Sequence, residues 1–266
     1  MLEFWGIRGT APVSGKNKSL YGGRTICSCL RIAPDEIIIL DAGTGIMELG
    51  NNLSSSINGN PLKVHLLLTH FHLDHIIGLP FFSPLFSHET QITFYSPISE
   101  LETENILQDL MKGRFFPLDF TDTPSTRTFK QLPKDGFMIG DVGISWCNLH
   151  HPQGSVAYRI DQDEQSIVMA TDTEHPETGV DENLARLCQD ADILVYDAMY
   201  TPEDYPTFKG WGHSTWLAGT ELAKAAGIKS LYLSHLNPAY KDGQITFILK
   251  RAQQNFRSSV IPVEEE

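Results

Sequence analysis

Short apolar runs, broken by glycine, proline and charged turns, are the main pattern of the first hundred residues. These runs predict strands at Leu2–Arg8, Ile26–Ala33, Ile37–Leu40, Lys63–Thr69 and Gln91–Tyr95. Helices are expected at Ile46–Leu53 and after Ser99, where Glu102 stands three residues further on, as in a capping box. In this half of the chain, strands are therefore followed by helices.

Residues 113–135 are weakly patterned, and they predict either a lid or substrate-facing loop or a plain surface connection. Beyond them, strands are expected at Val142–Leu149, Ser155–Ile160, Ser166–Ala170, Ile193–Tyr196 and Lys229–Ser234. Helices are expected at Glu182–Cys188, Ser214–Ala226 and Gln244–Phe256. Because strands followed by helices occur once in each half, we predict two sheets packed together with helices outside.

The length and composition are those of a globular protein. At 266 residues the chain fits one large domain, or at most two small ones, and 41% hydrophobic residues are enough for a sizeable core. No apolar run approaches a membrane span, and the first residues resemble a strand more than a secretory signal. Its 4 cysteines do not indicate a disulfide framework, and Cys27 and Cys29 are expected to pack in the core. A cytoplasmic location is the default expectation.

The net charge is −13, from 20 basic and 33 acidic residues. No cluster of Lys and Arg stands out, so the sequence disfavours nucleic acid as a partner. A small anionic substrate is compatible with this charge, because bound divalent cations would dominate the local field and invert its sign. We expect a small-molecule substrate and no membrane partner, and a homodimer is compatible with the sequence.

The segment Thr69–His75 holds three histidines and an aspartate directly after an apolar run. If the strand conformation persists past Thr69, His70 and His72 point to the same side and could converge on one ion. Asp74 and His75 lie at the following turn and could face a second ion. Imidazole and carboxylate together are ligands for zinc, iron or manganese, so this segment predicts part of a metal site.

A dinuclear site needs more ligands, and the remaining candidates also follow predicted strands. They are His150 and His151, Asp172, His213, and His235. Each alone is a weak signal, since a lone histidine at a strand end is commonly structural. The adjacent His150 and His151 would face opposite ways, so at most one of them can point into a site.

The order of these motifs resembles the metallo-β-lactamase superfamily. The motifs are Thr-His-x-His-x-Asp-His, His-Pro-x-Gly, Thr-Asp-Thr, Gly-His-Ser-Thr and Ser-His, in chain order. Phe4–Thr10, Tyr21–Gly23 and Leu40–Gly45 are similar to its phosphodiesterase-like branch, which includes tRNase Z and cyclic-phosphate phosphodiesterases. The resemblance implies one α/β (α+β) domain over residues 1–266, a four-layer αββα sandwich of two mixed β-sheets with helices outside.

The resemblance also implies a role for each candidate residue. The first ion would be held by His70, His72 and His151, the second by Asp74, His75 and His235, and Asp172 would bridge both. His151 is preferred over His150 because the Pro-x-Gly that follows it matches the family pattern. Asp41 would support the ligand loop by hydrogen bonds. His213 would lie near the scissile phosphate without ligating a metal.

The expected cofactors are two divalent metal ions, with zinc preferred over manganese or iron. A hydroxide bridging the ions would attack phosphorus. Asp74 would orient the hydroxide and take its proton, while His213 would stabilise the developing charge or protonate the leaving oxygen. We expect the N–H groups of a helix starting at Ser214 to favour a bound anion. Arg24 would bind a substrate phosphate or simply lie on the surface.

A dinuclear hydrolase acting on a small or cyclic phosphodiester is therefore the leading hypothesis. A tRNA 3′-processing endonuclease is a second hypothesis, although tRNase Z enzymes often carry an RNA-gripping arm between the positions of His151 and Asp172. Here only a hairpin fits in that interval. A thioester or lactam hydrolase on the same metal core is a third hypothesis, and a non-catalytic, metal-dependent binding module is a fourth.

Overall fold

The structure is a computed structural model that describes residues 2–57, 61–256 and 259–261. Its contacts divide the chain into two compact units. The first unit contains the residues up to Pro12 and Arg24–Leu132, and the second contains Val13–Gly23 and the residues from Pro133 onward. Each unit is described by itself, and the single domain expected from the sequence stays a prediction.

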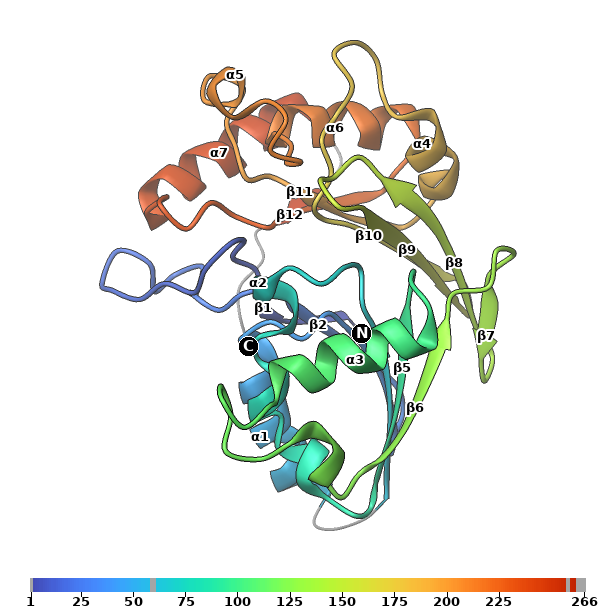
Figure 1. Cartoon of the computed structure of the whole chain (residues 1–266). Coiled ribbons are helices and arrows are strands. Elements are labelled where there is room, and N and C mark those ends of the chain that lie inside the picture. The colour runs from blue at the N-terminus through green and yellow to red at the C-terminus, as the bar shows by residue number, and fades with distance from the viewer. Residues whose placement is uncertain (1, 58–60, 257–258, 262–266) are drawn as a thin grey trace. The chain divides into compact units, whose positions relative to one another are not determined.

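The first unit is built on a six-stranded mixed sheet (Figure 1). In spatial order its strands are β1 (Leu2–Gly6), β2 (Cys27–Ala33), β3 (Glu36–Leu40), β4 (Leu62–Leu67), β5 (Thr90–Ser96) and β6 (Thr126–Gln131). The first three strands pair antiparallel, and β3 to β6 run parallel. The carboxyl ends of the parallel strands therefore meet at one edge, where a site can collect side chains from several loops.

One face of this sheet is covered by helices α1 (Gly45–Ile57) and α3 (Glu100–Leu110). Alternate strand residues, among them Cys27, Cys29, Ile37 and Ile39, form the core with the apolar stripe of α1. Both cysteines are free thiols in this core, as expected. Shorter helical turns follow β4 and α3: α2 (Leu73–Ile76), η1 (Leu79–Phe81), η2 (Ser83–Phe86) and η3 (Phe120–Asp122).

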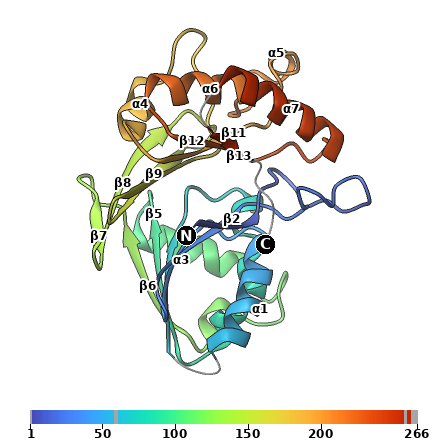
Figure 2. The ribbon, with the colours of Figure 1, turned by 180° about the vertical axis from the view of Figure 1, so that it is seen from behind.

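The second unit is built on a seven-stranded sheet in the order β13-β12-β11-β10-β9-β8-β7 (Figure 2). Its strands are β7 (Phe137–Ile139), β8 (Val142–Leu149), β9 (Ser155–Gln162), β10 (Gln165–Ala170), β11 (Ile193–Asp197), β12 (Ser230–Ser234) and β13 (Ser259–Ile261). β7 to β10 pair antiparallel, and β10 to β13 run parallel. Helices α4 (Glu182–Cys188), α6 (Trp216–Ala225) and α7 (Asp242–Asn255) lie against this sheet, and α5 (Tyr205–Phe208) is a single turn.

The prediction of two mixed sheets with helices is confirmed, with three local corrections. The weakly patterned residues 113–135 contain the strand β6, whose exposed, polar sequence gives no apolar run. The short strands β7 and β13 were not predicted at all. Helix α6 begins at Trp216 and not at Ser214, because Thr215 caps it by accepting a hydrogen bond from the Ala218 N–H. Among the described residues, no helix is long and apolar enough to cross a bilayer.

Candidate metal site

In the first unit, the buried carboxylate of Asp41 organises the loop after β4. Its two oxygens accept hydrogen bonds from the Thr69 N–H and the Thr69 hydroxyl, both at 2.8 Å. Oδ2 also lies 2.8 Å from His75 Nδ1. Because Asp41 contacts Nδ1, the other ring nitrogen of His75, Nε2, is left to face a metal ion. Carboxylates commonly support metal-binding histidines in this way.

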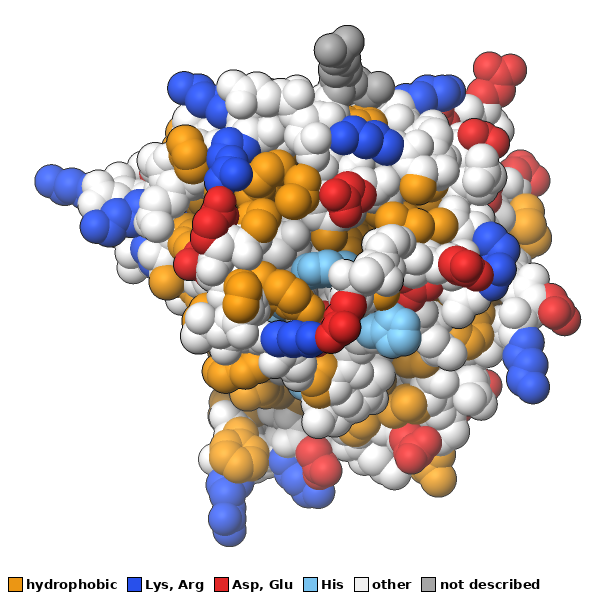
Figure 3. Space-filling model, turned by 90° about the horizontal axis from the view of Figure 1, so that it is seen from above, with side chains coloured by type: hydrophobic (Ala, Val, Ile, Leu, Met, Phe, Trp, Pro, Cys, Tyr) orange, Lys and Arg blue, Asp and Glu red, His pale blue; other side chains and the backbone are white. Residues whose placement is uncertain are grey.

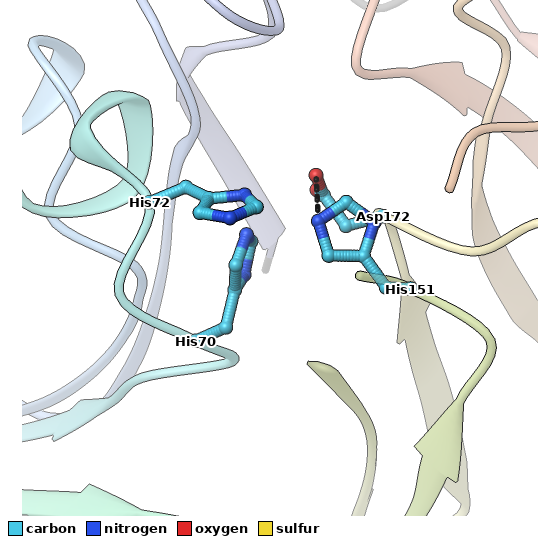
Figure 4. Close-up of side chains that lie close together, drawn as sticks. All are labelled: His70, His72, His151 and Asp172. Carbon is cyan, nitrogen blue, oxygen red and sulfur yellow. Dashed lines mark ion pairs between the residues drawn. The ribbon is translucent and has the colours of Figure 1, made fainter. Parts of the chain in front are cut away.

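The four predicted ligands of this loop lie close together. The His70 ring lies 4.5 Å from that of His72 and 4.3 Å from that of His75, between centroids. His75 Nε2 lies 3.5 Å from Asp74 Oδ2, which also accepts a hydrogen bond from the Thr10 N–H at 2.6 Å. Figure 4 shows His70 and His72 on this loop. Strand β4 ends at Leu67, so the strand alternation expected past Thr69 is not present. The loop and the short helix α2 bring these imidazoles and the carboxylate together instead.

Close backbone packing fixes the position of this loop. A Cβ atom on Gly43 would lie 2.3 Å from the Asp74 carbonyl oxygen and 2.6 Å from that of Ile26. The N–H of Ala42 donates to the His75 carbonyl at 2.6 Å. The Leu40–Gly45 motif therefore needs a residue without a side chain at Gly43, so that it can support the ligand loop through its backbone.

In the second unit, three histidines surround the buried carboxylate of Asp172. His151 Nε2 lies 3.7 Å from Asp172 Oδ1, the contact drawn as a dashed line in Figure 4. His235 Nε2 lies 3.2 Å from Oδ2, and His213 Nδ1 lies 3.8 Å from Oδ1. Asp172, His213 and His235 each offer a donor atom within 4.8 Å of the others.

Three of the predicted site residues adopt left-handed backbone conformations. Asp41 has a φ of 59°, Asp172 a φ of 59° and His235 a φ of 53°. All three follow a strand of a sheet, and aspartate and histidine tolerate this conformation better than most residues other than glycine. Residues held in sparsely populated backbone regions gather at functional sites, and the roles predicted for these three stay predictions.

Asp197, which the sequence analysis did not select, connects the groups of the second unit. It is fully buried at the end of β11, and its Oδ2 lies 3.0 Å from His213 Nδ1 and accepts the Asp172 N–H at 3.0 Å. Its Oδ1 accepts the N–H groups of Ser214 and Met199. The available signal was its place directly after the apolar run Ile193–Tyr196, the same signal that marked Asp172.

The adjacent histidines 150 and 151 occupy different environments. The His150 side chain is 71% exposed and lies 3.2 Å from Asp181, whereas the His151 side chain is 1% exposed. His151 Nδ1 lies 2.8 Å from the carbonyl oxygen of Gly212. These positions favour His151 as the metal ligand, in line with the preference drawn from the family motif.

Ser214 itself is engaged by other protein groups, and the anion site expected at this helix start stays a prediction. The Ser214 N–H donates to Asp197, and the fully buried hydroxyl lies 2.8 Å from His175 Nδ1 and 3.0 Å from Tyr196 Oη. These contacts fit a residue that holds the His213 segment, and they leave no donor for a substrate. The Arg24 Nη1 donates to the Trp5 carbonyl at 3.5 Å, and its predicted phosphate contact stays a prediction.

The donors of both units fit divalent metal ions. Asp172 and Asp197 are 1% and 0% exposed, and a buried carboxylate needs hydrogen bonds or a compensating charge, which a metal ion can supply. Imidazoles and carboxylates dominate both groups, and no cysteine belongs to them. Such a set suits zinc, manganese or iron and does not choose among them.

The chain is similar to known proteins over most of its length. A family model described as the beta-lactamase superfamily domain matches residues 37–236. Ribonuclease Z from Exiguobacterium sibiricum is 25% identical over 250 residues, which cover 77% of this chain and 82% of that protein. This likeness conflicts with the prediction that nucleic acid is disfavoured as a partner, so that prediction is withdrawn.

Solved structures share the fold. The metallo-beta-lactamase fold protein YhfI from Bacillus subtilis gives a TM-score of 0.72 at 20% identity, covering 99% of this chain and 96% of that one. A diphosphatase from the PhnP family gives a TM-score of 0.67 at 13% identity, covering 99% and 94%. The chain therefore belongs to the β-lactamase superfamily as a metal-dependent hydrolase with the metallo-β-lactamase fold, and its predicted likeness to the phosphodiesterase-like branch is confirmed.

Proposed function

We propose that this protein is a dinuclear phosphodiesterase that acts on a small or cyclic phosphodiester. The observation that carries the proposal is the His213–Asp197 pair, 3.0 Å apart beside Asp172. His213 is extra to the seven predicted ligands and is fixed by a buried carboxylate. A histidine held in this way beside the predicted ligands can serve as a proton donor to the leaving group.

Following the likeness to the superfamily, we assign seven residues to two metal ions. The first ion is assigned to His70, His72 and His151, the second to Asp74, His75 and His235, and Asp172 is assigned to both. A carboxylate with two oxygens suits the bridging position, and Asp172 already approaches His151 with one oxygen and His235 with the other. Asp41 would hold the His75 ring in place through its contact with Nδ1.

Bound divalent ions would lower the pKa of the attacking water and neutralise the non-bridging phosphate oxygens. Asp74 orients the water and takes its proton. Asp197 accepts the Nδ1–H of His213, so Nε2 is the His213 atom that carries the proton for the leaving oxygen. The buried Asp197 carboxylate would fix the orientation of the His213 ring for this step.

Two observations support a small substrate. The interval between His151 and Asp172 holds only the β9–β10 hairpin, with no room for an RNA-gripping arm. Lys and Arg side chains lie scattered among acidic ones on the face drawn in Figure 3, without forming one basic patch there. A small phosphodiester needs few phosphate contacts, so it does not require such a patch.

Processing of tRNA 3′ ends is the second candidate. The similarity to ribonuclease Z supports it, because the match covers 77% of this chain. The chemistry would be the same, since both substrates are phosphodiesters. The two candidates differ only in how the protein would bind the parts of the substrate beyond the phosphodiester.

A substrate screen with metal-reconstituted protein tests the proposal. We expect turnover of bis(p-nitrophenyl) phosphate and of at least one cyclic or linear small phosphodiester. Precursor tRNA, nitrocefin and a glutathione thioester are the comparison substrates, at equal enzyme and metal concentrations. Turnover of nitrocefin or the thioester alone would contradict a phosphodiesterase, and efficient cleavage of precursor tRNA alone would favour the second candidate. Binding of nucleotides without any turnover would indicate a binding module.

A further inference from the structure

The segment leading to His213 is fastened by the carboxylate of Glu174, in the connection between β10 and α4. Glu174 Oε1 accepts hydrogen bonds from the Tyr205 hydroxyl at 2.6 Å and from the Gly210 N–H at 2.7 Å. Its Oε2 accepts the Gly212 N–H at 3.1 Å. Burial raises the pKa of Glu174, but these three hydrogen bonds outweigh it and leave the pKa below its usual value.

Gly212 connects this carboxylate to His151. Its carbonyl oxygen lies 2.8 Å from His151 Nδ1, which places the proton on Nδ1 and leaves Nε2 as the nitrogen that can ligate a metal. Gly212 has a φ of 81°, and a Cβ atom there would lie 2.4 Å from His151 Nδ1 and 2.3 Å from Pro152 Cδ. The Gly212 peptide is thus clamped between Glu174 on its N–H side and His151 on its carbonyl side.

The same two segments, residues 174–177 and 209–212, are also joined by an ion pair at the surface. Lys209 and Glu177 form an ion pair, but their side chains are 53% and 77% exposed. Exposed pairs contribute about 0–1 kcal/mol. Gly212 is buried, so losing the Glu174 carboxylate would cost its N–H a hydrogen bond that holds the peptide closed to solvent. Of these two links, only Glu174 can hold the Gly212 peptide in place.

We propose that Glu174 is a positioning residue for the metal site. Glu174 holds the Gly212 peptide, and the Gly212 carbonyl fixes the tautomer and the ring orientation of His151. Through Gly210 and Gly212, it also fixes the position of the backbone just before His213. This inference rests on the proposed function in treating His151 as a ligand and His213 as the proton donor. It assigns a role to a residue that is neither a ligand nor in contact with the substrate.

The test compares Glu174→Gln and Glu174→Ala with the control Glu177→Gln in the full-length chain. All three partners of Glu174 are hydrogen-bond donors. Glutamine has only one acceptor oxygen, and its NH2 group cannot accept from a donor, so at least one of the three hydrogen bonds is lost. In metal-free protein, we expect the Gly212 amide to exchange with solvent at least about tenfold faster, and the His151 ring to lose its single tautomer in 15N spectra. Zinc affinity, measured by competition with a chelating dye, should fall about 10–100-fold, as for other residues behind metal ligands. Glu177→Gln should change none of these.

Unchanged zinc affinity and an unchanged His151 tautomer in Glu174→Gln would overturn the inference. A fall in melting temperature without these two changes would show a purely structural role, which also contradicts it. If Glu174→Ala does not fold, the glutamine variant alone decides. None of these measurements uses a substrate, so failure of the phosphodiesterase proposal would leave their outcome unaffected.

Discussion

His213 is held at its Nδ1 by the buried carboxylate of Asp197, 3.0 Å away. Replacing His213 with alanine should leave metal content unchanged and lower phosphodiester turnover by about two orders of magnitude, the lower end of general acid–base contributions. Metal analysis and steady-state kinetics on bis(p-nitrophenyl) phosphate check this. Full activity at unchanged metal content would remove His213 from the mechanism.

His175, beside Ser214, predicts a pH dependence of stability. Burial lowers its pKa below the ordinary value of 6.5, so the unfolded state binds more protons than the folded state below that pH. The free energy of unfolding should therefore fall as the pH drops from about 6.5 through the folded pKa. His175→Asn, which cannot titrate, should show a flatter decline in denaturant titrations between pH 7 and pH 5. Equal slopes for both proteins would contradict this account.

Single residues were predictable where they follow an apolar run. The ligand-type residues His70, His151 and Asp172 were found in this way, and the structure places them at loop starts. Asp197 gave the same signal, but a lone aspartate after a strand carries little weight until its partner His213 is seen. Glu174 gave no signal, because its acceptor role depends on N–H groups more than 30 residues away.

At the scale of elements, the loop joining β3 to α1 supports the metal loop through its backbone. Gly43→Ala would place a methyl group 2.3 Å from the Asp74 carbonyl, so the loops must separate. We expect a loss of about 1–3 kcal/mol in the free energy of unfolding, as for other overpacked sites, together with weaker metal binding. Gly113→Ala is the matched control, because nothing lies within 4 Å of its Cβ position. Denaturant unfolding of both variants measures the difference, and equal stabilities would refute the packing argument.

The buried strands could be read from the sequence because their apolar runs are continuous. The exposed edge strand β6 could not, since only pairing with β5 identifies it. The start of α6 was misplaced by two residues because both Ser214 and Thr215 are good capping residues. Only the structure shows that the Ser214 hydroxyl is engaged by His175 and Tyr196, which leaves the cap to Thr215.

For the whole molecule, family and fold could be predicted from the order of short motifs. The same motifs do not identify the substrate, because recognition depends on surfaces that share no motif. Charge alone proved a poor guide: a net charge of −13 suggested that nucleic acid is excluded, while a relative matched over 77% of this chain is a ribonuclease Z. Local chemistry at a metal site is set by the ions and their ligands more than by net charge.

The central claim is that two metal ions, held by the seven predicted ligands, support phosphodiester hydrolysis. The most direct test is the rate of bis(p-nitrophenyl) phosphate hydrolysis as zinc is added to metal-free protein. The account predicts a rate that rises to a plateau at two equivalents, while Asp172→Ala, which lacks the shared ligand, binds fewer ions and stays inactive. A plateau at one equivalent, or no hydrolysis with two ions bound, would contradict it.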